Sequence, residues 1–378
     1  MAAHLTPIGR RTFLALLASA CVAPAGPSMS SGNSLPSTED DGPLFLGARL
    51  NSGSHEVAVI DEHGRDLLVL PVPARGHSFA IDSARRRAVA FGRAPGRFAV
   101  AFDIDGGSAP HAIAPPADRH FFGHGAFTPG GRLLLATEND FGAGQGVVGI
   151  YDAGKGFARI GEIASGGIGP HEAVLLGDGK TLCVANGGIL THPDYGGQKL
   201  NLDTMQPGLA YIDVETGDLT DQVFLAPELS RLSIRHLAID ALGTIWFGCQ
   251  YQGEPAQRPP LVGRHRRGRE PELFAGPDET LKAMNNYVGS VAVDASGEIV
   301  ATSSPRGGLV AFWDAATGRH LGNRELADGC GVAPLERHHV LATSGRGAVT
   351  DLSPGATGLL LPPAPGRPAW DNHLRRMG

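Results

Sequence analysis

Hydrophobic and polar positions along this chain repeat in two phrases. The first phrase is a short apolar run that ends in small residues, at positions 44–50, 87–93, 132–139, 181–187, 244–250, 298–304 and 339–345. The second is a hairpin in which an apolar strand meets a polar turn residue before a further strand. The turn residues of its successive copies are Asp61, Asp103, Asp152, Asp213, His265, Asp314 and Asp351. Apolar runs of this length between turn residues predict short β-strands.

The two phrases predict an all-β fold, a seven-bladed β-propeller. Each phrase occurs seven times, and successive turn residues lie about 37 to 61 residues apart, which brackets the length of a four-stranded blade. Only a polar segment precedes residue 44, so the first blade lacks an inner strand. Residues 370–375 fit that vacancy. We therefore expect the C-terminal strand to pair into the first blade and close the ring without an open sheet edge.

A histidine recurs at one position of the predicted inner strands. Around the ring, the aligned residues are His373, His77, His124, His171, His236, Ser290 and Cys330. Equivalent positions in a closed repeat face a common axis, so we expect these side chains to converge at one mouth of the channel. The alignment of His77 is fixed only to within one residue, and a shift by one residue would turn its side chain to the other face of the strand.

The same mouth is expected to carry the loops between the second and third strands of each blade. The fourth blade has a lid-like insertion at residues 188–208, long enough to reach over the mouth. Long loops in compact folds are more often functional than idle. The candidate ligand-binding residues on this side are His192, Asp194, Lys199, Asn201, Glu138, Asn139, Arg93, Arg97, Arg306 and Arg346.

Composition agrees with a turn-rich β-fold and excludes one class of partner. The chain of 378 residues contains 54 Gly and 28 Pro and has a formal net charge of −6. No basic cluster is interleaved with aromatic residues, so we expect no nucleic-acid partner. Cys183, Cys249 and Cys330 of the predicted propeller form no CxxC pair. We therefore expect no extensive disulfide framework and at least one free thiol.

The N-terminal residues 1–25 have the features of an export signal. Arg10 and Arg11 precede an apolar run at 13–20, which is too short to cross a bilayer and ends in small residues. The segment resembles a twin-arginine signal peptide, which directs folded proteins to the periplasm and does not anchor them. Cleavage would leave a Ser/Pro/Asp-rich tether at 26–42.

The mature chain is expected to consist of the tether and a propeller at residues 43–378, without a transmembrane segment. Cleavage after Ala20 would expose Cys21. However, Ala18 stands where lipoprotein signals carry a larger aliphatic residue, so lipid anchoring at Cys21 is the less favoured alternative.

Four motifs together resemble one protein family. They are GGI-x-THPD-x-G-x-x-KLNL-x-TM-x-P, TEND-x-GxGxG, YVGSVAVD and DGCGVAP. The resemblance is to the bacterial domain-of-unknown-function family numbered fifteen-thirteen and covers essentially the whole mature chain. It implies a twin-arginine-exported periplasmic propeller, with imelysin-like iron-uptake proteins as partners and no established reaction. Gly197 and Gly208 stand where arginine and serine are commoner. We expect a monomer.

The predicted ring of histidines favours a transition-metal site. Neutral imidazole suits iron, copper, nickel and zinc, and thiolate suits Cu(I), zinc or iron. With the iron association that the resemblance implies, we predict a role in metal uptake or handling, with iron or copper favoured over zinc. The predicted ligands are His77, His124, His171, His236, His373 and Cys330. The alternative is that each histidine bonds within its own blade, although Ser290 shows that a blade can lack it.

Other interpretations stay open at this point. The arginines either bind an anion such as a metal chelate through bidentate pairing, or are solvated turn residues. His192 and Asp194 either belong to a site or to a proline-containing turn. A metal-dependent enzyme of unknown reaction is a further alternative, but the sequence has no Gly-x-Ser-x-Gly elbow and no HExxH motif. A protein-interaction platform without metal would favour exposed aromatic residues, yet aromatics make up only 6% of the chain.

Overall fold

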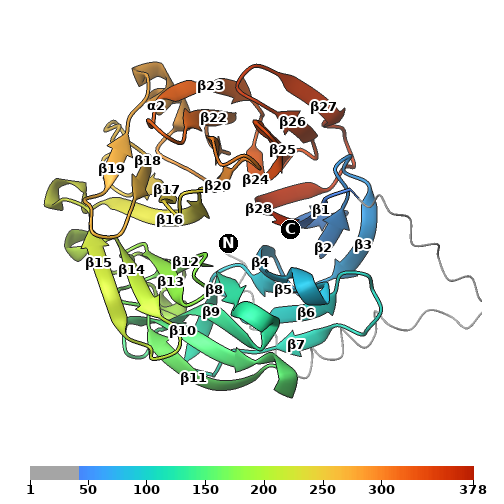
Figure 1. The fold of residues 1–378 in the computed structure, drawn as a ribbon, viewed down its shortest axis with the longest axis vertical. Helices are drawn as coiled ribbons and strands as arrows, with labels where there is room; N and C mark the ends of the chain where they lie inside the picture. Colours follow the sequence, from blue (N-terminus) through green and yellow to red (C-terminus); the bar gives the residue numbers. More distant parts are fainter. Residues whose placement is uncertain (1–41) are drawn as a thin grey trace, which may run out of the picture.

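A ring of seven four-stranded sheets forms the protein in the computed structural model, which describes residues 42–378 (Figure 1). The expected signal peptide at 1–25, with Cys21, and the tether up to residue 41 lie outside the described residues. Among the described helices, none combines the length and apolar character needed to cross a membrane.

The blades follow one another around the ring in chain order. The first blade contains β1 (Leu44–Asn51), β2 (Ser54–Ile60), β3 (Asp66–Pro71) and the last strand, β28 (Ala369–Met377). The second and third contain β4 (Gly76–Asp82), β5 (Arg87–Gly92), β6 (Ala99–Asp103), β7 (His111–Ile113), β8 (Arg119–Phe127), β9 (Leu133–Asp140), β10 (Gln145–Asp152) and β11 (Ala158–Ala164). The fourth contains β12 (Pro170–Leu175), β13 (Thr181–Asn186), β14 (Gly208–Asp213) and β15 (Leu219–Phe224).

The remaining blades have the same order of strands. The fifth and sixth contain β16 (Leu232–Ile239), β17 (Ile245–Tyr251), β18 (Val262–His265), β19 (Glu272–Phe274), β20 (Ser290–Val293), β21 (Ile299–Ser304), β22 (Leu309–Asp314) and β23 (His320–Glu325). The seventh contains β24 (Gly329–Glu336), β25 (His339–Ser344), β26 (Val349–Leu352) and β27 (Thr357–Leu361). The helix α2 (Asp278–Met284) lies between β19 and β20. The 3₁₀ turns are Ser83–Arg85, Pro129–Gly131, Ala153–Lys155, Pro193–Tyr195, Leu202–Thr204 and Pro227–Leu229.

The predicted fold is confirmed. The apolar runs identified in the sequence are the second strands of the blades, from β1 at Leu44 to β25 at His339. Strand β28 pairs antiparallel with β1, from Leu44 opposite Met377 to Leu50 opposite Ala369. The C-terminal strand therefore closes the ring inside the first blade, as expected.

Local hydrogen bonds explain the repeated aspartate of the hairpins. The Asp61 carboxylate accepts from the backbone N–H groups of His63 and Arg65 at 2.9 Å each, and Asp213 serves its own turn in the same way. In the fifth blade, His265 bonds instead to the Tyr211 hydroxyl at 2.6 Å and to the Arg269 carbonyl at 2.8 Å. Both ring nitrogens of this histidine are satisfied, which marks it as structural.

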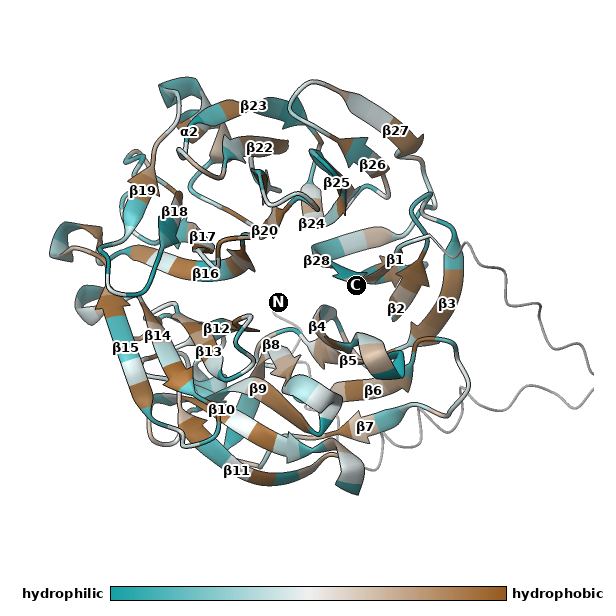
Figure 2. Cartoon of the chain, in the orientation of Figure 1, coloured by the Kyte–Doolittle hydropathy of each residue, from teal (hydrophilic) through white to brown (hydrophobic). Residues whose placement is uncertain are grey.

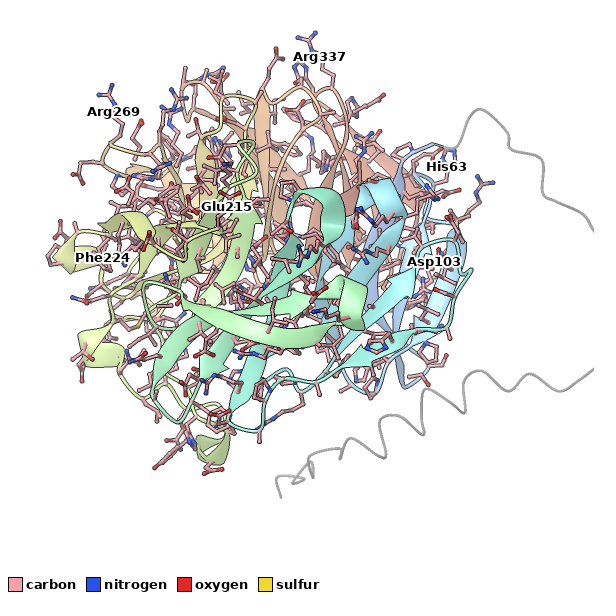
Figure 3. The ribbon with its side chains drawn as sticks, turned by 60° about the horizontal axis from the view of Figure 1, so that its bottom comes forward. His63, Asp103, Glu215, Phe224, Arg269 and Arg337 are labelled. Atoms are coloured by element: carbon pink, nitrogen blue, oxygen red, sulfur yellow. The ribbon has the colours of Figure 1, made fainter. Side chains whose placement is uncertain are left out.

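Apolar side chains fill the spaces between neighbouring blades. One core cluster joins Phe91 of β5, Phe121 of β8 and Leu134 of β9, all buried. Apolar and polar positions alternate along many strands (Figure 2), as expected for sheets packed face to face. Charged side chains such as Arg269 and Arg337 extend from the outer turns (Figure 3). The sheets thus form a closed, packed ring around the central channel.

The inner strands are irregular where the aligned histidines lie. The register against the second strand shifts in β4, β8, β12, β16, β24 and β28. The remaining inner strand, β20, begins with Ser290 and pairs with β21 without a shift. A β-bulge inserts an extra residue and redirects side chains, so that neighbouring residues no longer alternate strictly between the two faces. The bulges therefore allow two neighbouring side chains to reach the channel.

Candidate metal centre

Five histidines from the inner strands β4, β8, β12, β16 and β28 meet in the channel. Each is at most 9% exposed, and they are His77, His124, His171, His236 and His373. The ring centroids of contacting pairs lie between 4.5 Å, for His77 and His373, and 6.2 Å, for His124 and His236. The rings thus form one buried cluster, and the position of His77, uncertain in the sequence alignment, lies within it.

The donor atoms of this cluster form two groups that could hold a metal ion. The larger group consists of His124, Glu172, His236 and His373, and the smaller one of His77, His124 and His171. In each group, all ligand atoms lie within 4.8 Å of one another. Because His124 belongs to both groups, we expect one ion per chain.

Distances in the larger group match a metal coordination shell. His124 Nε2 lies 3.6 Å from Glu172 Oε2 and 3.2 Å from His373 Nε2, and His236 Nδ1 lies 3.5 Å from Glu172 Oε2. Ligands at about 2.1 Å from an ion are about 3.4 Å apart in a tetrahedral site and about 3.0 Å apart as octahedral neighbours. Small side-chain adjustments would bring the four donors to one ion.

The histidines of the cluster are in the protonation state that metals bind. Burial lowers the pKa of His77 to about 4, although Asp371 opposes this effect. Burial also lowers the pKa values of His124, His171, His236 and His373. The imidazoles are therefore neutral at physiological pH, and a neutral ring nitrogen is what a metal ion requires.

Glu172 supplies the negative charge of the larger group. Burial raises the pKa of Glu172, but Arg375, His124 and His236 outweigh burial and hold the pKa below its usual range. The carboxylate accepts from an Arg375 guanidinium nitrogen through Oε1 and from the Leu237 backbone N–H through Oε2 at 3.2 Å. These contacts fix an ionised carboxylate among the three imidazoles.

A second carboxylate orients the smaller group. Asp371 Oδ1 lies 3.2 Å from His77 Nδ1, and its other oxygen accepts from Arg75. A carboxylate on one ring nitrogen leaves the other nitrogen available and raises its basicity, as around many metal sites. Asp371 thus positions His77 as a ligand.

Several ring nitrogens of the cluster are buried without a partner. Within residues 42–378, His124 Nδ1, His171 Nδ1 and both ring nitrogens of His236 have no hydrogen bond. By contrast, His120 on the same strand as His124 is satisfied, by the Phe121 carbonyl at 3.1 Å and the Asn139 amide at 2.9 Å. Buried polar atoms are nearly always paired, so unpaired ones point to a bound water or ion. The donor set therefore fits a metal.

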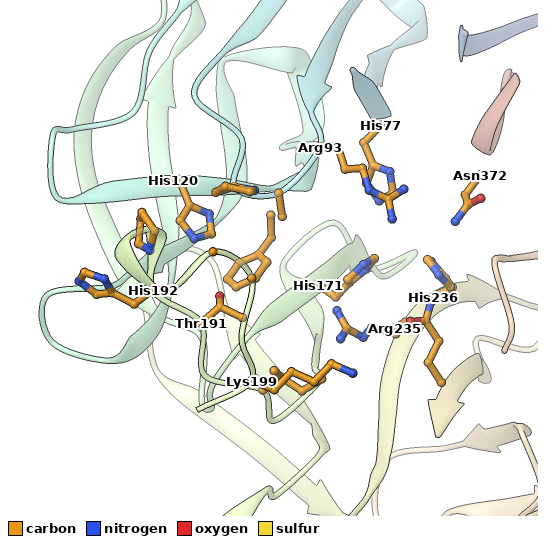
Figure 4. Close-up of a pocket in the computed structure, with 18 of the residues that line it drawn as sticks. His77, Arg93, His120, His171, Thr191, His192, Lys199, Arg235, His236 and Asn372 are labelled. Atoms are coloured by element: carbon orange, nitrogen blue, oxygen red, sulfur yellow. The ribbon is translucent and has the colours of Figure 1, made fainter. Parts of the chain in front are cut away.

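A cavity of about 470 Å³ opens beside the cluster (Figure 4). His77, His171 and His236 form one side of it. The insertion contributes Thr191, His192 and Lys199. The predicted lid-like segment therefore lies along the approach to the histidines.

Cys330 is not part of either donor group in the described chain. It lies in β24 beside a bulge, and its thiol donates to the Asp328 carbonyl at 3.2 Å. Burial raises the pKa of the Cys330 thiol above its ordinary value. Cys183 and Cys249 are likewise buried and free, so none of these three thiols forms a disulfide.

The predicted residues of the insertion serve different purposes. His192 Nδ1 accepts from the Asp194 backbone N–H at 3.2 Å, as expected for a proline-containing turn. Asn201 bridges the loop, accepting from the Leu190 N–H at 2.7 Å and donating to the Gly188 carbonyl at 2.9 Å. Lys199 lines the cavity and donates to the neutral amide oxygen of Gln252. Among these residues, His192 and Lys199 face the cavity.

The other predicted rim residues are dispersed. Glu138 is buried in its own blade and accepts from Arg159 at 2.9 Å, away from the donor groups. The Asn139 side-chain amide donates to His120 Nε2 and to the Thr191 carbonyl.

The predicted arginines divide in the same way. Arg93 lines the cavity, with Nη1 3.6 Å from Asp371. Arg306 stacks over the Tyr287 ring at 4.5 Å, Arg97 lies over the Phe141 ring at 5.5 Å, and Arg346 is exposed. Of the four, Arg93 is the one that borders the cavity.

The sequence reasoning missed five residues of this region, which are Glu172, Asp371, Arg235, Arg375 and His120. Four of them are next to, or two positions from, a predicted histidine. Strict alternation along a strand would turn an adjacent residue away from the channel, and the bulges at 170–172 and 234–236 remove that alternation. The sequence signal for Glu172 and Arg235 is that each stands directly beside a predicted histidine, in the polar pairs His171-Glu172 and Arg235-His236.

Comparison with known proteins identifies one family. The family described as "Protein of unknown function (DUF1513)" matches residues 70–377. No curated protein is significantly similar in sequence.

Several solved structures share the fold at low sequence identity. A chain of Kuenenia stuttgartiensis hydrazine synthase is 13% identical with a TM-score of 0.62, over 86% of this chain and 99% of that one. The Cps50 (Swd1) β-propeller domain of Myceliophteria thermophila is 13% identical with a TM-score of 0.56, over 82% and 95%. A chain of the mitotic checkpoint complex is 14% identical with a TM-score of 0.55, over 91% and 88%. At such identities the likeness establishes the propeller fold alone.

Proposed function

We propose that this chain, which belongs to the DUF1513 family of proteins of unknown function, binds one transition-metal ion at the histidine cluster of its channel. The observation that carries the proposal is the set of buried, unpartnered ring nitrogens on His124, His171 and His236. Of these atoms, His236 Nδ1 lies 3.5 Å from the buried Glu172 carboxylate, and the donor atoms of the larger group lie within 4.8 Å of one another. A purely structural cluster would leave these nitrogens unsatisfied at a cost in stability.

We propose iron or copper as the ion. The larger group offers three imidazoles and one carboxylate, a donor set that suits divalent iron, copper and zinc. Two features bear on the choice. The thiol of Cys330 bonds to Asp328, so the soft ligand that Cu(I) prefers is not in the set. Iron is supported by the association with imelysin-like proteins that the motifs of the sequence imply.

We further propose that the protein acts in the periplasm, in metal uptake or handling. Arg10 and Arg11 before the apolar run at 13–20 support export by the twin-arginine route. Imelysin-like iron-uptake proteins are the proposed partners. Replacing Arg10 and Arg11 by lysine should retain the protein in the cytoplasm; an unchanged periplasmic fraction would contradict this part of the proposal.

Metal analysis of protein purified from its native compartment tests the central claim. We expect about one equivalent of iron or copper per chain, and loss of that metal in the double variant His124→Ala/His171→Ala. The matched control is His120→Gln, because His120 is buried on the same strand as His124 but belongs to neither donor group. A folded wild-type protein without metal, whose stability does not change when Fe²⁺, Cu²⁺ or Zn²⁺ is added, would refute the proposal.

A further inference from the structure

The cavity beside the candidate metal centre is lined by three cationic side chains, two of which have no acidic partner among the described residues. Arg93, Lys199 and Arg235 line it, and its lining contains no Asp or Glu (Figure 4). Arg235 Nε is buried without a hydrogen-bond partner, and no described residue forms an ion pair with this guanidinium. Lys199 donates to Gln252, which is neutral. Two of the three cations therefore have no counter-charge on the protein.

The nearest carboxylates are already engaged. Asp371 bonds to Arg75 and His77, and lies 3.6 Å from Arg93. Glu172 bonds to Arg375. A divalent ion in the cluster would add further positive charge to a region that these two carboxylates do not neutralise. Arg235 is half-buried with a buried Nε, so the lack of a counter-charge is unfavourable there, whereas Lys199 is exposed to solvent.

The cations also disfavour one another. Burial lowers the pKa of Lys199, and the charges of Arg235 and Arg306 lower it further. Burial lowers the pKa of Arg235 to about 10, with a contribution from Arg93. A bound anion would remove both penalties.

We propose that this cavity binds a small polycarboxylate anion, held by Arg235 and Lys199, next to the metal ion. Arg235 comes from β16 and Lys199 from the insertion, so an anion between them contacts two segments. The guanidinium presents the fork that a carboxylate accepts, while Tyr287 and Asn372 add neutral hydrogen-bonding groups to the lining. The volume of about 470 Å³ suits a small organic molecule rather than a monatomic ion.

The anion would share the centre with the metal. The same cavity is lined by His77, His171 and His236, so a carboxylate held by Arg235 and Lys199 lies on the side from which a further oxygen ligand reaches the ion. This part rests on the proposed function, whereas anion binding by the metal-free protein does not. The substrate class is then a metal accompanied by its polycarboxylate ligand.

Calorimetric titration of citrate into the metal-free, full-length protein tests the inference. We expect saturable binding that weakens with salt and falls by about 30-fold or more in Arg235→Gln and in Lys199→Gln. The control Arg346→Gln removes the same charge from an exposed arginine and should leave affinity unchanged. Arg235→Lys should retain part of the affinity, and thermal unfolding of each variant shows whether it is folded.

The outcomes separate this inference from the proposed function. If the wild type binds Zn²⁺ or Cu²⁺ in citrate-free buffer but not citrate, only the anion site is wrong. If citrate binds and metal does not, the metal centre is wrong. In the single variant His124→Ala, whose side chain belongs to both donor groups but is not in the cavity lining, citrate binding should persist while metal binding is lost. Inorganic phosphate that binds as tightly as citrate, with the same dependence on Arg235, would overturn the assignment to a polycarboxylate.

Discussion

Replacement of His236 by leucine, compared with the same change at His120, separates a metal ligand from a structural histidine. Both side chains are buried, at 1% and 2% exposed, and leucine is close to histidine in volume. Neither nitrogen of His236 has a hydrogen bond, and Nδ1 lies 3.5 Å from Glu172. A buried polar group without a partner disfavours the folded state by about 1–3 kcal/mol. In chelator, His236→Leu should therefore leave the free energy of unfolding unchanged or raise it.

The same substitution at His120 should act in the opposite sense. Leucine at this position would remove the Nδ1 bond to the Phe121 carbonyl and the Nε2 acceptor of the Asn139 amide, although the carbonyl keeps its bond from the Gly96 N–H and the amide its bond to Thr191. Each lost hydrogen bond contributes about 0.5–1.5 kcal/mol, so His120→Leu should lower the free energy of unfolding by about 1–3 kcal/mol in chelator.

Added metal should stabilise His120→Leu by about 2.6 kcal/mol more than it stabilises His236→Leu. A free ion at 1,000 times its dissociation constant stabilises the folded state by about 4 kcal/mol. If loss of one ligand weakens binding by about 100-fold, His236→Leu keeps only about 1.4 kcal/mol of that gain. His120→Leu keeps all of it.

Urea unfolding followed by tryptophan fluorescence, in chelator and in excess Zn²⁺, measures all three proteins. Two results would refute the reasoning. One is that His236→Leu destabilises the metal-free protein as much as His120→Leu does, and the other is that Zn²⁺ stabilises none of the three proteins.

Three more predictions follow from the same site. In chelator, the urea midpoint should fall as the pH decreases from about 6.5 toward 4, because burial lowers the pKa of His77 to about 4 and the unfolded chain then binds more protons than the folded one; a His77→Gln variant with an equally steep dependence would contradict this. Competition with a chromophoric chelator should give affinities in the order Cu²⁺ above Zn²⁺, with Fe²⁺ weaker and Mn²⁺ weakest, whereas a preference for Ca²⁺ or Mg²⁺ would show that the imidazoles do not bind. Cys330→Ala should leave copper affinity within about twofold, because this thiol bonds to Asp328, and the copper-loaded protein should lack a thiolate charge-transfer band.

The fold follows from the sequence because every blade repeats the same local rules. The apolar run of each second strand and the Asx-type turn of most hairpins are decided within a few residues, as the bonds of Asp61 and Asp213 show. The closure by β28 follows as well, since the missing strand of the first blade and the unassigned C-terminal phrase complement each other. Local patterns of this kind give the same local structure in whichever blade they occur.

The centre follows only in part, because the bulges alter which residues share a face. A regular strand would place Glu172 on the side opposite His171, yet both belong to the donor groups. The bulge in β16 likewise brings Arg235 to the cavity beside its neighbour His236. In β24 the aligned Cys330 also lies at a bulge, and its thiol meets Asp328 rather than the imidazoles. Register irregularities depend on the packing of the whole ring, which a repeat alignment does not contain.

The strand that closes the ring carries much of the candidate centre. Asp371, His373 and Arg375 all lie on β28, the strand that closes the ring onto β1. Until β28 docks, the larger donor group lacks His373, and Glu172 lacks the guanidinium that keeps it ionised. The proposed ion binding would therefore depend on closure of the ring by β28. The proposed ion would cross-link β28 of the first blade to β8, β12 and β16 of the third, fourth and fifth blades, and so would oppose detachment of the strand that closes the ring.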